Sequence, residues 1–188
     1  KCMRGMKMNN FKEMYSADLD RYEGKPDAYL KKFHFYFRKC QSTENPFFLA
    51  IYRFWFKRIK EKHGIELYYK TQIGKGFHLG HPFNITINEN VVIGNKIPTQ
   101  ITDNGNKVSI GIGNNCNIHK GVCIGQENRG SRKGVPQIGN CCWIGINAVI
   151  VGNIHIGDDV LIAPNAYVNC DIPSHSIVFG NPCIIKQH

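Results

Sequence analysis

Aliphatic residues recur at every sixth position in the C-terminal part of this chain, and small or compact residues accompany most of them. Between residues 136 and 168 these positions are Ile138, Ile144, Ile150, Ile156, Ile162 and Val168. A six-residue unit is too short to bury its apolar residue alone, so many coils must stack to form a core. The repeat therefore indicates an all-β solenoid of short parallel strands. An all-β sandwich is the alternative, but it would not keep so regular a period.

The same interval continues upstream and breaks at three places. The count holds from Leu67 to Leu79, and two extra residues then enter around His81. The second break, at about 95–111, contains an Asn-Gly pair between short β-prone runs, which is typical of a hairpin. The third break falls in the polar loop 126–134. Loops on a rigid scaffold often carry function, so we expect the site near these breaks.

The first 64 residues predict helices instead of strands. Leu30, Phe33, Phe37 and Cys40 fall on one helical face, and Pro26 suits a first-turn position. The chain therefore divides into an N-terminal helical segment, residues 1–64, and a repeat domain, residues 65–188, that carries the 95–111 insertion.

A second helix is expected from Asn45-Pro46 to Lys62, because basic residues fill its last turns and Gly64 follows. The residues that we expect to face inward are Phe48, Ile51, Tyr52, Trp55 and Ile59. The favoured interpretation is a cap packed on the repeat domain and on a neighbouring subunit. The alternative is a helix that docks on a membrane surface or a partner, because its other face is aromatic and basic.

Composition limits the partners and the compartment. The net charge of +10 favours an anionic partner, but the chain has no motif for reading nucleic acid. The eight cysteines form no CxxC pair, so free thiols in a reducing compartment are expected. No signal peptide or membrane-spanning run is evident, and we therefore expect a cytoplasmic protein.

Several motifs resemble the hexapeptide-repeat acyltransferases, most closely the serine O-acetyltransferases and related polysaccharide-type O-acetyltransferases. They are Ile65-Glu66-Leu67, the segment from Ile73 to His81, Ile87-Asn88, the segments 115–125 and 129–136, and Gly180-Asn181-Pro182. The resemblance covers about residues 64–186. It implies a left-handed parallel β-helix with three hexads per coil, a homotrimer with active sites between neighbouring subunits, and acetyl-CoA as co-substrate.

The resemblance also assigns catalytic residues. Histidine is a common general base because imidazole titrates close to neutral pH. His81, at the first break in the repeat, would deprotonate an acceptor hydroxyl as it attacks the thioester of acetyl-CoA. Glu66, fifteen residues upstream, points outward between two inward residues and would hold the ring of His81 in position.

Further residues are expected to hold the ligands. Backbone groups of Gly145, Ile146, Ala163 and Pro164 would contact the pantetheine arm, as the resemblance implies. The basic residues expected near the coenzyme phosphates are Arg132, Lys133 and Lys186, and those expected near the acceptor are His119 and Arg129. No metal site is expected, because the histidine pattern of the carbonic anhydrases built on this fold is missing.

The acceptor stays open between L-serine and a sugar hydroxyl. Gly80 and Val135 stand where the serine-specific members have an acidic residue and a second histidine. The predicted function is thus acetyl-CoA-dependent O-acetyl transfer to a hydroxyl. The alternative is a non-catalytic β-helix scaffold or a membrane-surface binding protein.

Overall fold

A computed structural model of the chain describes residues 4–22, 26–93 and 113–187. Three helices come first: α1 (Arg4–Asp20), α2 (Ala28–Ser42) and α3 (Pro46–Lys62). Short strands follow: β1 (Glu66–Leu67), β2 (Gln72–Ile73), β3 (His78–Gly80), β4 (Thr86–Ile87), β5 (Val92–Ile93), β6 (Asn117–His119), β7 (Cys123–Gly125), β8 (Gln137–Ile138), β9 (Trp143–Ile144), β10 (Val149–Val151), β11 (His155–Ile156), β12 (Leu161–Ile162), β13 (Tyr167–Val168), β14 (Ser176–Phe179) and β15 (Ile184–Gln187).

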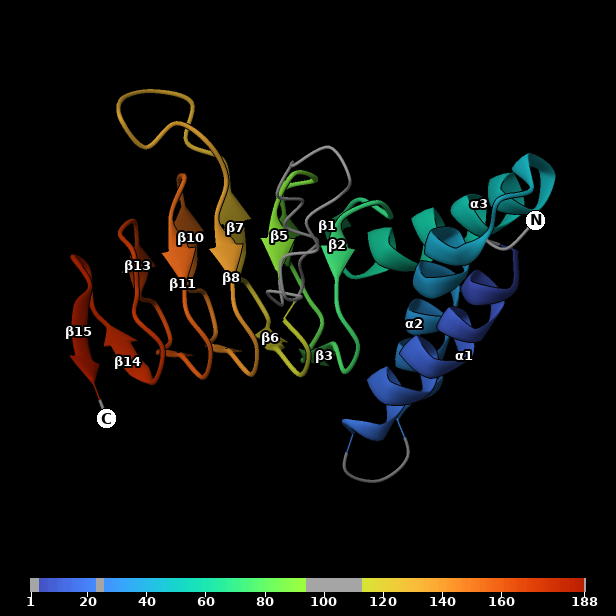
Figure 1. The fold of residues 1–188 in the computed structure, drawn as a ribbon, viewed down its shortest axis with the longest axis horizontal. Helices are drawn as coiled ribbons and strands as arrows, with labels where there is room; N and C mark the ends of the chain where they lie inside the picture. Colours follow the sequence, from blue (N-terminus) through green and yellow to red (C-terminus); the bar gives the residue numbers. More distant parts are fainter. Residues whose placement is uncertain (1–3, 23–25, 94–112, 188) are drawn as a thin grey trace.

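The strands form three sheets that the chain visits in turn. Sheet A has the order β1-β4-β7-β10-β13, sheet B the order β2-β5-β8-β11, and sheet C the order β3-β6-β9-β12-β14-β15. The neighbouring strands are parallel, except that β15 reverses direction and pairs antiparallel with β14. Figure 1 shows the coils stacked side by side, with the three helices at one end and β15 at the other.

The six-residue ladder fills the space between the sheets. Ile138, Ile144, Ile150, Ile156, Ile162 and Val168 are all buried, as predicted. In each two-residue strand whose burial is described, the second residue is buried and the first is exposed or half-buried. Stacked aliphatic side chains remove this apolar surface from water coil by coil, which is the main stabilisation of such a fold. The insertion predicted at 95–111 lies outside the described residues.

The helices begin at side-chain caps. Asp27 precedes α2, and its Oδ1 accepts a hydrogen bond from the Leu30 N–H at 2.7 Å. Pro26 therefore lies before the cap, and the prediction that it occupies the first turn was wrong. Asn45 caps α3, which ends at Lys62 as predicted. Within the described part of the chain, no helix has the length and apolar character needed to cross a membrane.

The inward face of α3 differs from the prediction. Phe56 is the buried residue of this helix, and it packs on the aromatic rings of α2. Phe48, Ile51 and Trp55, which were expected to face inward, are 51%, 39% and 47% exposed. The helix has apolar residues on both sides, so periodicity alone could not select the side that α2 covers.

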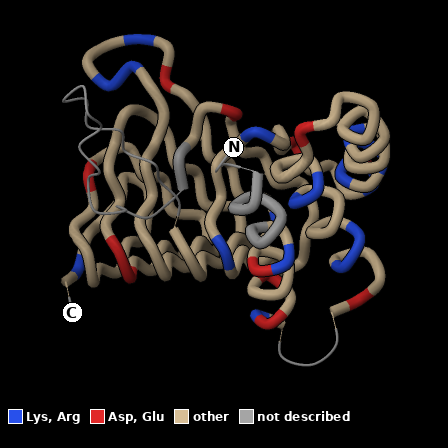
Figure 2. Tube along the Cα trace, turned by 45° about the vertical axis from the view of Figure 1, so that its right-hand side comes forward, with Lys and Arg blue, Asp and Glu red and all other residues tan. Residues whose placement is uncertain are grey.

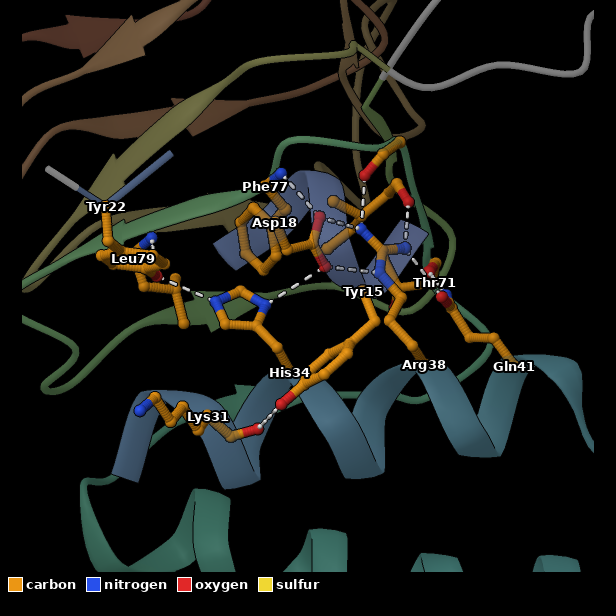
Figure 3. A network of polar contacts seen from close by, with 12 residues as sticks. Tyr15, Asp18, Tyr22, Lys31, His34, Arg38, Gln41, Thr71, Phe77 and Leu79 are labelled. Carbon is orange, nitrogen blue, oxygen red and sulfur yellow. Dashed lines mark hydrogen bonds and ion pairs between the residues drawn. The ribbon is translucent and has the colours of Figure 1, made fainter. Parts of the chain in front are cut away.

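A buried polar network joins the helices to the first coil (Figure 3). Asp18 of α1 and Arg38 of α2 are 0% and 1% exposed, and their side chains form two hydrogen bonds, of 2.7 and 3.0 Å. Arg38 also donates to the backbone oxygens of Ile73 and Gly74, and Asp18 accepts from the Phe77 N–H. The helical segment is thus tied to β2 and the turn after it by charged groups as well as by apolar packing.

Candidate active site

The turns that lead from sheet C to sheet A stack into one continuous edge, which we call the His81 edge. Backbone hydrogen bonds join successive turns: Asn147 N–H donates to Lys120 O at 3.0 Å, and Asn165 N–H donates to Ile146 O at 2.9 Å. The turns that form this edge are residues 81–85, 120–122, 145–148 and 163–166. The edge therefore provides a row of regularly spaced backbone groups along the coils.

His81 begins the longest turn of this edge, residues 81–85. The Gly121 N–H donates to Phe83 O at 2.9 Å, so the regular turn begins at Phe83, and His81 and Pro82 are the two added residues. His81 has a φ of 54° and an exposed side chain. A positive φ is uncommon outside glycine, although histidine is among the residues that tolerate it. The turn therefore displays an imidazole to solvent directly after β3.

His119 lies next to His81, one coil further along. It pairs with Gly80 across β3 and β6, and its ring centroid is 4.5 Å from that of Trp143. Its Nε2 is buried without a hydrogen-bond partner. Burial first, and then the nearby His81, lower the pKa of His119 below its ordinary value, which favours the neutral ring. Because Nε2 is covered, the ring must turn before this nitrogen can bond a polar ligand at the edge.

Gly80 makes room for this ring. A Cβ atom at position 80 would lie 2.4 Å from Nδ1 and 2.5 Å from Cε1 of His119, closer than real contacts allow. We therefore expect Gly80→Ala to lower the free energy of unfolding by about 1–3 kcal/mol, because the ring must leave its packing on Trp143.

Urea denaturation of Gly80→Ala in two backgrounds, native and His119→Ala, checks this expectation. In the His119→Ala background, where the imidazole ring is absent, Gly80→Ala should lower the free energy of unfolding much less. An equal cost in both backgrounds would show that His119 does not limit the space at Gly80.

Glu66 lies on β1 in the first coil of sheet A, with its side chain pointing outward as predicted. Its Oε2 accepts a hydrogen bond from Thr86 Oγ1 at 3.4 Å, across the β1–β4 pair. Among the described residues, no hydrogen bond or ion pair joins Glu66 to His81. The predicted contact between the two side chains is thus not formed in this structure, although both belong to the first two coils beside the same edge.

The structure sorts the residues predicted to bind coenzyme into two groups. Gly145, Ile146, Ala163 and Pro164 all lie on the His81 edge, on the coils that follow His81. Backbone N–H groups of Gly145 and Ala163 are already used within sheet C, where they donate to Ile162 O and Val178 O at 2.8 and 2.7 Å. Their carbonyl oxygens accept from the Ala148 and Ala166 N–H groups, each at 3.2 Å, so a ligand contact from these two residues would use the second lone pair of a carbonyl oxygen.

The basic residues lie elsewhere. Arg129, Arg132 and Lys133 are exposed in the loop between β7 and β8, which leaves the coils at the edge between sheets A and B (Figure 1). Arg132 Nε lies 3.6 Å from Glu127 Oε2, and Lys186 lies on β15 at the end of the coils. One chain therefore does not gather these cations beside His81.

Tyr22, which the sequence did not single out, connects the helices to the site. Its hydroxyl forms a hydrogen bond of 2.8 Å with His34 Nε2 and accepts one of 3.0 Å from the Leu79 N–H. The centroid of its ring lies 4.5 Å from that of His78. Burial, followed by the charge of Arg21, lowers the pKa of His78 to about 4. No regular spacing in the sequence could have indicated contacts between segments this far apart.

Metal binding is not indicated in the described part of the chain, which holds no cluster of three His, Cys, Asp or Glu side chains able to bind an ion. The seven cysteines that the structure describes are free thiols, with Cys170 Sγ and Cys183 Sγ 3.6 Å apart. Cys142 is buried and hydrogen-bonded to the Gly157 carbonyl at 3.2 Å, which is typical of a core position.

The three stacked sheets are built from six-residue units, and a family model describes this repeat. The family model for the bacterial transferase hexapeptide (six repeats) matches residues 136–170. This segment covers β8 to β13, the most regular part of the ladder. The chain thus carries the repeat of the hexapeptide transferases.

Within this class the chain is similar to serine acetyltransferases. It is 33% identical to serine acetyltransferase 2 of Arabidopsis thaliana over 125 residues, which cover 66% of this chain and 33% of that protein. It is 30% identical to the serine acetyltransferase of Helicobacter pylori strain 26695 over 118 residues, 63% of this chain and 58% of that protein. The chain therefore spans less than two thirds of either relative. The resemblance to hexapeptide-repeat acyltransferases expected from the sequence is confirmed.

Solved structures show the same fold. The serine complex of Neisseria gonorrhoeae serine acetyltransferase superposes with a TM-score of 0.66 at 24% identity, over 95% of this chain and 69% of that chain. A serine acetyltransferase in complex with CoA gives a TM-score of 0.69 at 19% identity, over 95% and 70% of the two chains. The match covers nearly all of this chain, so it includes helices as well as coils.

Proposed function

We propose that this chain is an acetyl-CoA-dependent O-acetyltransferase of the serine acetyltransferase type, with L-serine or a sugar hydroxyl as acceptor. The observation that carries the proposal is the two-residue extension that displays His81 at the head of a row of backbone groups. The similarity to serine acetyltransferases supports the reaction, and the exposed position of His81 supports its role as the base.

His81 acts as general base in this mechanism. Its imidazole takes the proton from the acceptor hydroxyl while the hydroxyl oxygen attacks the carbonyl carbon of the thioester. The resulting tetrahedral intermediate then breaks its C–S bond, and the leaving thiolate receives the proton from His81 to give free CoA and the acetyl ester. Such a base is worth about 10² to 10⁴ in rate. Glu66 positions the His81 ring after a small rearrangement of its side chain.

His119 contacts the acceptor in this proposal, and Arg129 reaches it from a neighbouring subunit, because the loop of Arg129 leaves the coils at a different edge from His81. The unpaired Nε2 of His119 and the exposed imidazole of His81 lie on neighbouring coils, which suits a small polyhydroxylated or amino-acid acceptor held between them. Coenzyme A lies along the His81 edge, on Gly145, Ile146, Ala163 and Pro164.

The proposal includes a trimer of left-handed β-helices. Arg132 and Lys133 leave the coils at a different edge from His81, so a neighbouring subunit is needed to bring such cations to the coenzyme phosphates. Lys186 contributes from the end of the coils. Residues 1–64 form the helical cap, residues 65–188 form the β-helix domain, and the protein functions in the cytoplasm.

Release of CoA thiol from acetyl-CoA, measured against L-serine and a panel of sugars and sugar nucleotides, tests the proposal. Acceptor-dependent thiol release is expected with one member of the panel, together with an equal amount of acetyl ester detected by mass spectrometry. No ester with any hydroxyl acceptor would favour the scaffold alternative and overturn the proposed activity.

A further inference from the structure

The outer face of α3 is an apolar surface that the described part of the chain leaves exposed. Five large side chains on this face are between 39% and 69% exposed. They are Phe47, Phe48, Ile51, Phe54 and Trp55. At 100° per residue, Phe47, Ile51 and Phe54 fall on the side of the helix opposite Phe56, the residue that α2 buries, and Phe48 and Trp55 flank them. We call them the α3 outer face.

Cations flank this face. Arg58 and Lys62 follow the aromatic residues on the same side of the helix, and the Arg58 guanidinium stands 5.0 Å from the centroid of the Phe54 ring. Glu61 is the one acidic residue in α3, and it lies 3.8 Å from Lys57. Figure 2 marks the basic residues along the helices in blue. The helix therefore combines exposed aromatic groups with five Lys and Arg side chains, and its single carboxylate offsets only part of their charge.

A cavity of about 410 Å³ opens beside this face, between α3 and the segment from Leu67 to Tyr69. Arg53 and Lys57 line it together with Phe54, which belongs to the outer face. The Arg53 guanidinium stands 5.2 Å from the centroid of the Tyr69 ring. Lys60 and one carboxylate, Glu61, also line the cavity. Three cations on its wall outnumber this one negative charge, which favours an anionic group next to the apolar surface.

We propose that the α3 outer face docks this protein on an anionic phospholipid bilayer. The helix would lie parallel to the membrane, with its aromatic side chains among the headgroups and upper acyl chains. This arrangement is typical of interfacial amphipathic helices, in which apolar residues enter the boundary and Lys and Arg attract anionic lipids.

The positive charge of α3 and of the whole chain favours an anionic bilayer over a second copy of this chain as the partner of this face. Two copies in contact through this face would bring together surfaces that carry Arg58 and Lys62, on chains with a net charge of +10 each. The helix offers one carboxylate, Glu61, against five Lys and Arg side chains, whereas an anionic bilayer supplies one negative charge per acidic lipid. The proposal does not depend on the proposed acetyl transfer, because the face lies on the helical segment and not on the His81 edge.

Co-sedimentation of the full chain with vesicles tests the proposal. We expect binding to phosphatidylcholine vesicles that contain about 30% phosphatidylglycerol, and at least about tenfold weaker binding to pure phosphatidylcholine. The double variant Phe47→Ser/Phe54→Ser should bind at least about tenfold more weakly, because it removes two apolar groups that enter the boundary. Arg58→Glu should weaken binding to the anionic vesicles.

Matched controls alter the same kinds of side chain elsewhere. Leu161→Ser/Ile184→Ser changes two exposed apolar residues of the coils, which are 40% and 55% exposed, and Lys120→Glu reverses one exposed charge near the His81 edge. These variants should bind vesicles as the native chain does. An equal loss in the controls would show that binding is not specific to α3, and would overturn the proposal.

Fluorescence reports on the face directly. The chain has two tryptophans, so in the Trp143→Phe background Trp55 is the one that remains. Its emission should shift to shorter wavelength when anionic vesicles are added, and Phe47→Ser/Phe54→Ser should abolish the shift. No shift, or a native chain that stays unbound, would overturn the proposal. The proposal would also be overturned if the double variant dissociated an oligomer in sedimentation velocity experiments but bound vesicles as the native chain does.

Discussion

Replacing His81 with alanine should lower acceptor-dependent acetyl transfer at least about a hundredfold while the protein stays folded. The side chain is exposed at a turn and fills no space in the core, so its removal leaves the apolar ladder intact. The loss should fall on kcat, because the base acts on the hydroxyl proton during the chemical step. Steady-state kinetics with acetyl-CoA and the acceptor found by the panel would measure it.

His155→Ala is the matched control for this variant. His155 is 63% exposed on β11 in sheet B, and its Nδ1 lies 3.9 Å from Asp171 Oδ1, away from the His81 edge. Its activity should stay within about twofold of the native value, because it contacts neither ligand. Near-native turnover by a folded His81→Ala protein would remove His81 as the general base, and circular dichroism on the same sample would verify the fold.

The repeat was predictable because one physical requirement fixes it. Each coil must point aliphatic residues inward at equivalent positions, so that they stack on those of the next coil. The sequence therefore shows the six-residue period directly. Breaks in the count were equally informative. The two added residues at His81 are visible as a step of eight between Leu79 and Ile87, and the structure places them in a longer turn between β3 and β4.

The helical segment was harder to predict, because its buried contacts do not follow an apolar pattern. Asp18 is fully buried on α1, at a position where periodicity would require an apolar residue, so this helix gave no amphipathic signal. In α3 the opposite problem arose, since large apolar residues lie on both sides. The packing partner, Phe56 against Phe33 and Phe37 of α2, decides which side is buried.

The site was predictable only where residues lie on the repeat. Gly145 and Ala163 were named because of the resemblance to hexapeptide-repeat acyltransferases, and the ladder predicts only that equivalent positions in successive coils stack on one edge. The packing of His119 on Gly80 depends on a strand register that no local pattern reveals. For the same reason, the sequence could not show that Arg132 leaves the coils at a different edge from His81.

Replacing Asp18 with alanine should lower the free energy of unfolding by about 3–5 kcal/mol, because Arg38 would remain buried without its carboxylate. Burial alone would raise the pKa of Asp18, but the charge of Arg38 and the nearby His34 outweigh it and hold that pKa below its ordinary value. The carboxylate therefore stabilises the fold above about pH 4, and this contribution is lost as the pH falls through the folded-state pKa.

Glu13→Ala is the matched control, because Glu13 also pairs with a cation of the first coil. Its Oε1 lies 2.9 Å from Lys75 Nζ, but the two side chains are 61% and 48% exposed, so its removal should cost less than about 1 kcal/mol. Urea denaturation at pH 7 would compare the two variants. A small loss for Asp18→Ala, similar to that for Glu13→Ala, would show that Arg38 finds another way to be solvated.

A double variant keeps the test decisive if Asp18→Ala does not fold. Asp18→Leu/Arg38→Met replaces the buried ion pair with apolar groups of comparable size, and such exchanges are often neutral or stabilising. It gives up the bonds from Arg38 to Ile73 O and Gly74 O, so we expect it to be more stable than Asp18→Ala but less stable than the native chain. A double variant no more stable than Asp18→Ala would mean that the guanidinium bonds to the first coil, and not the ion pair, hold the helices to the β-strands.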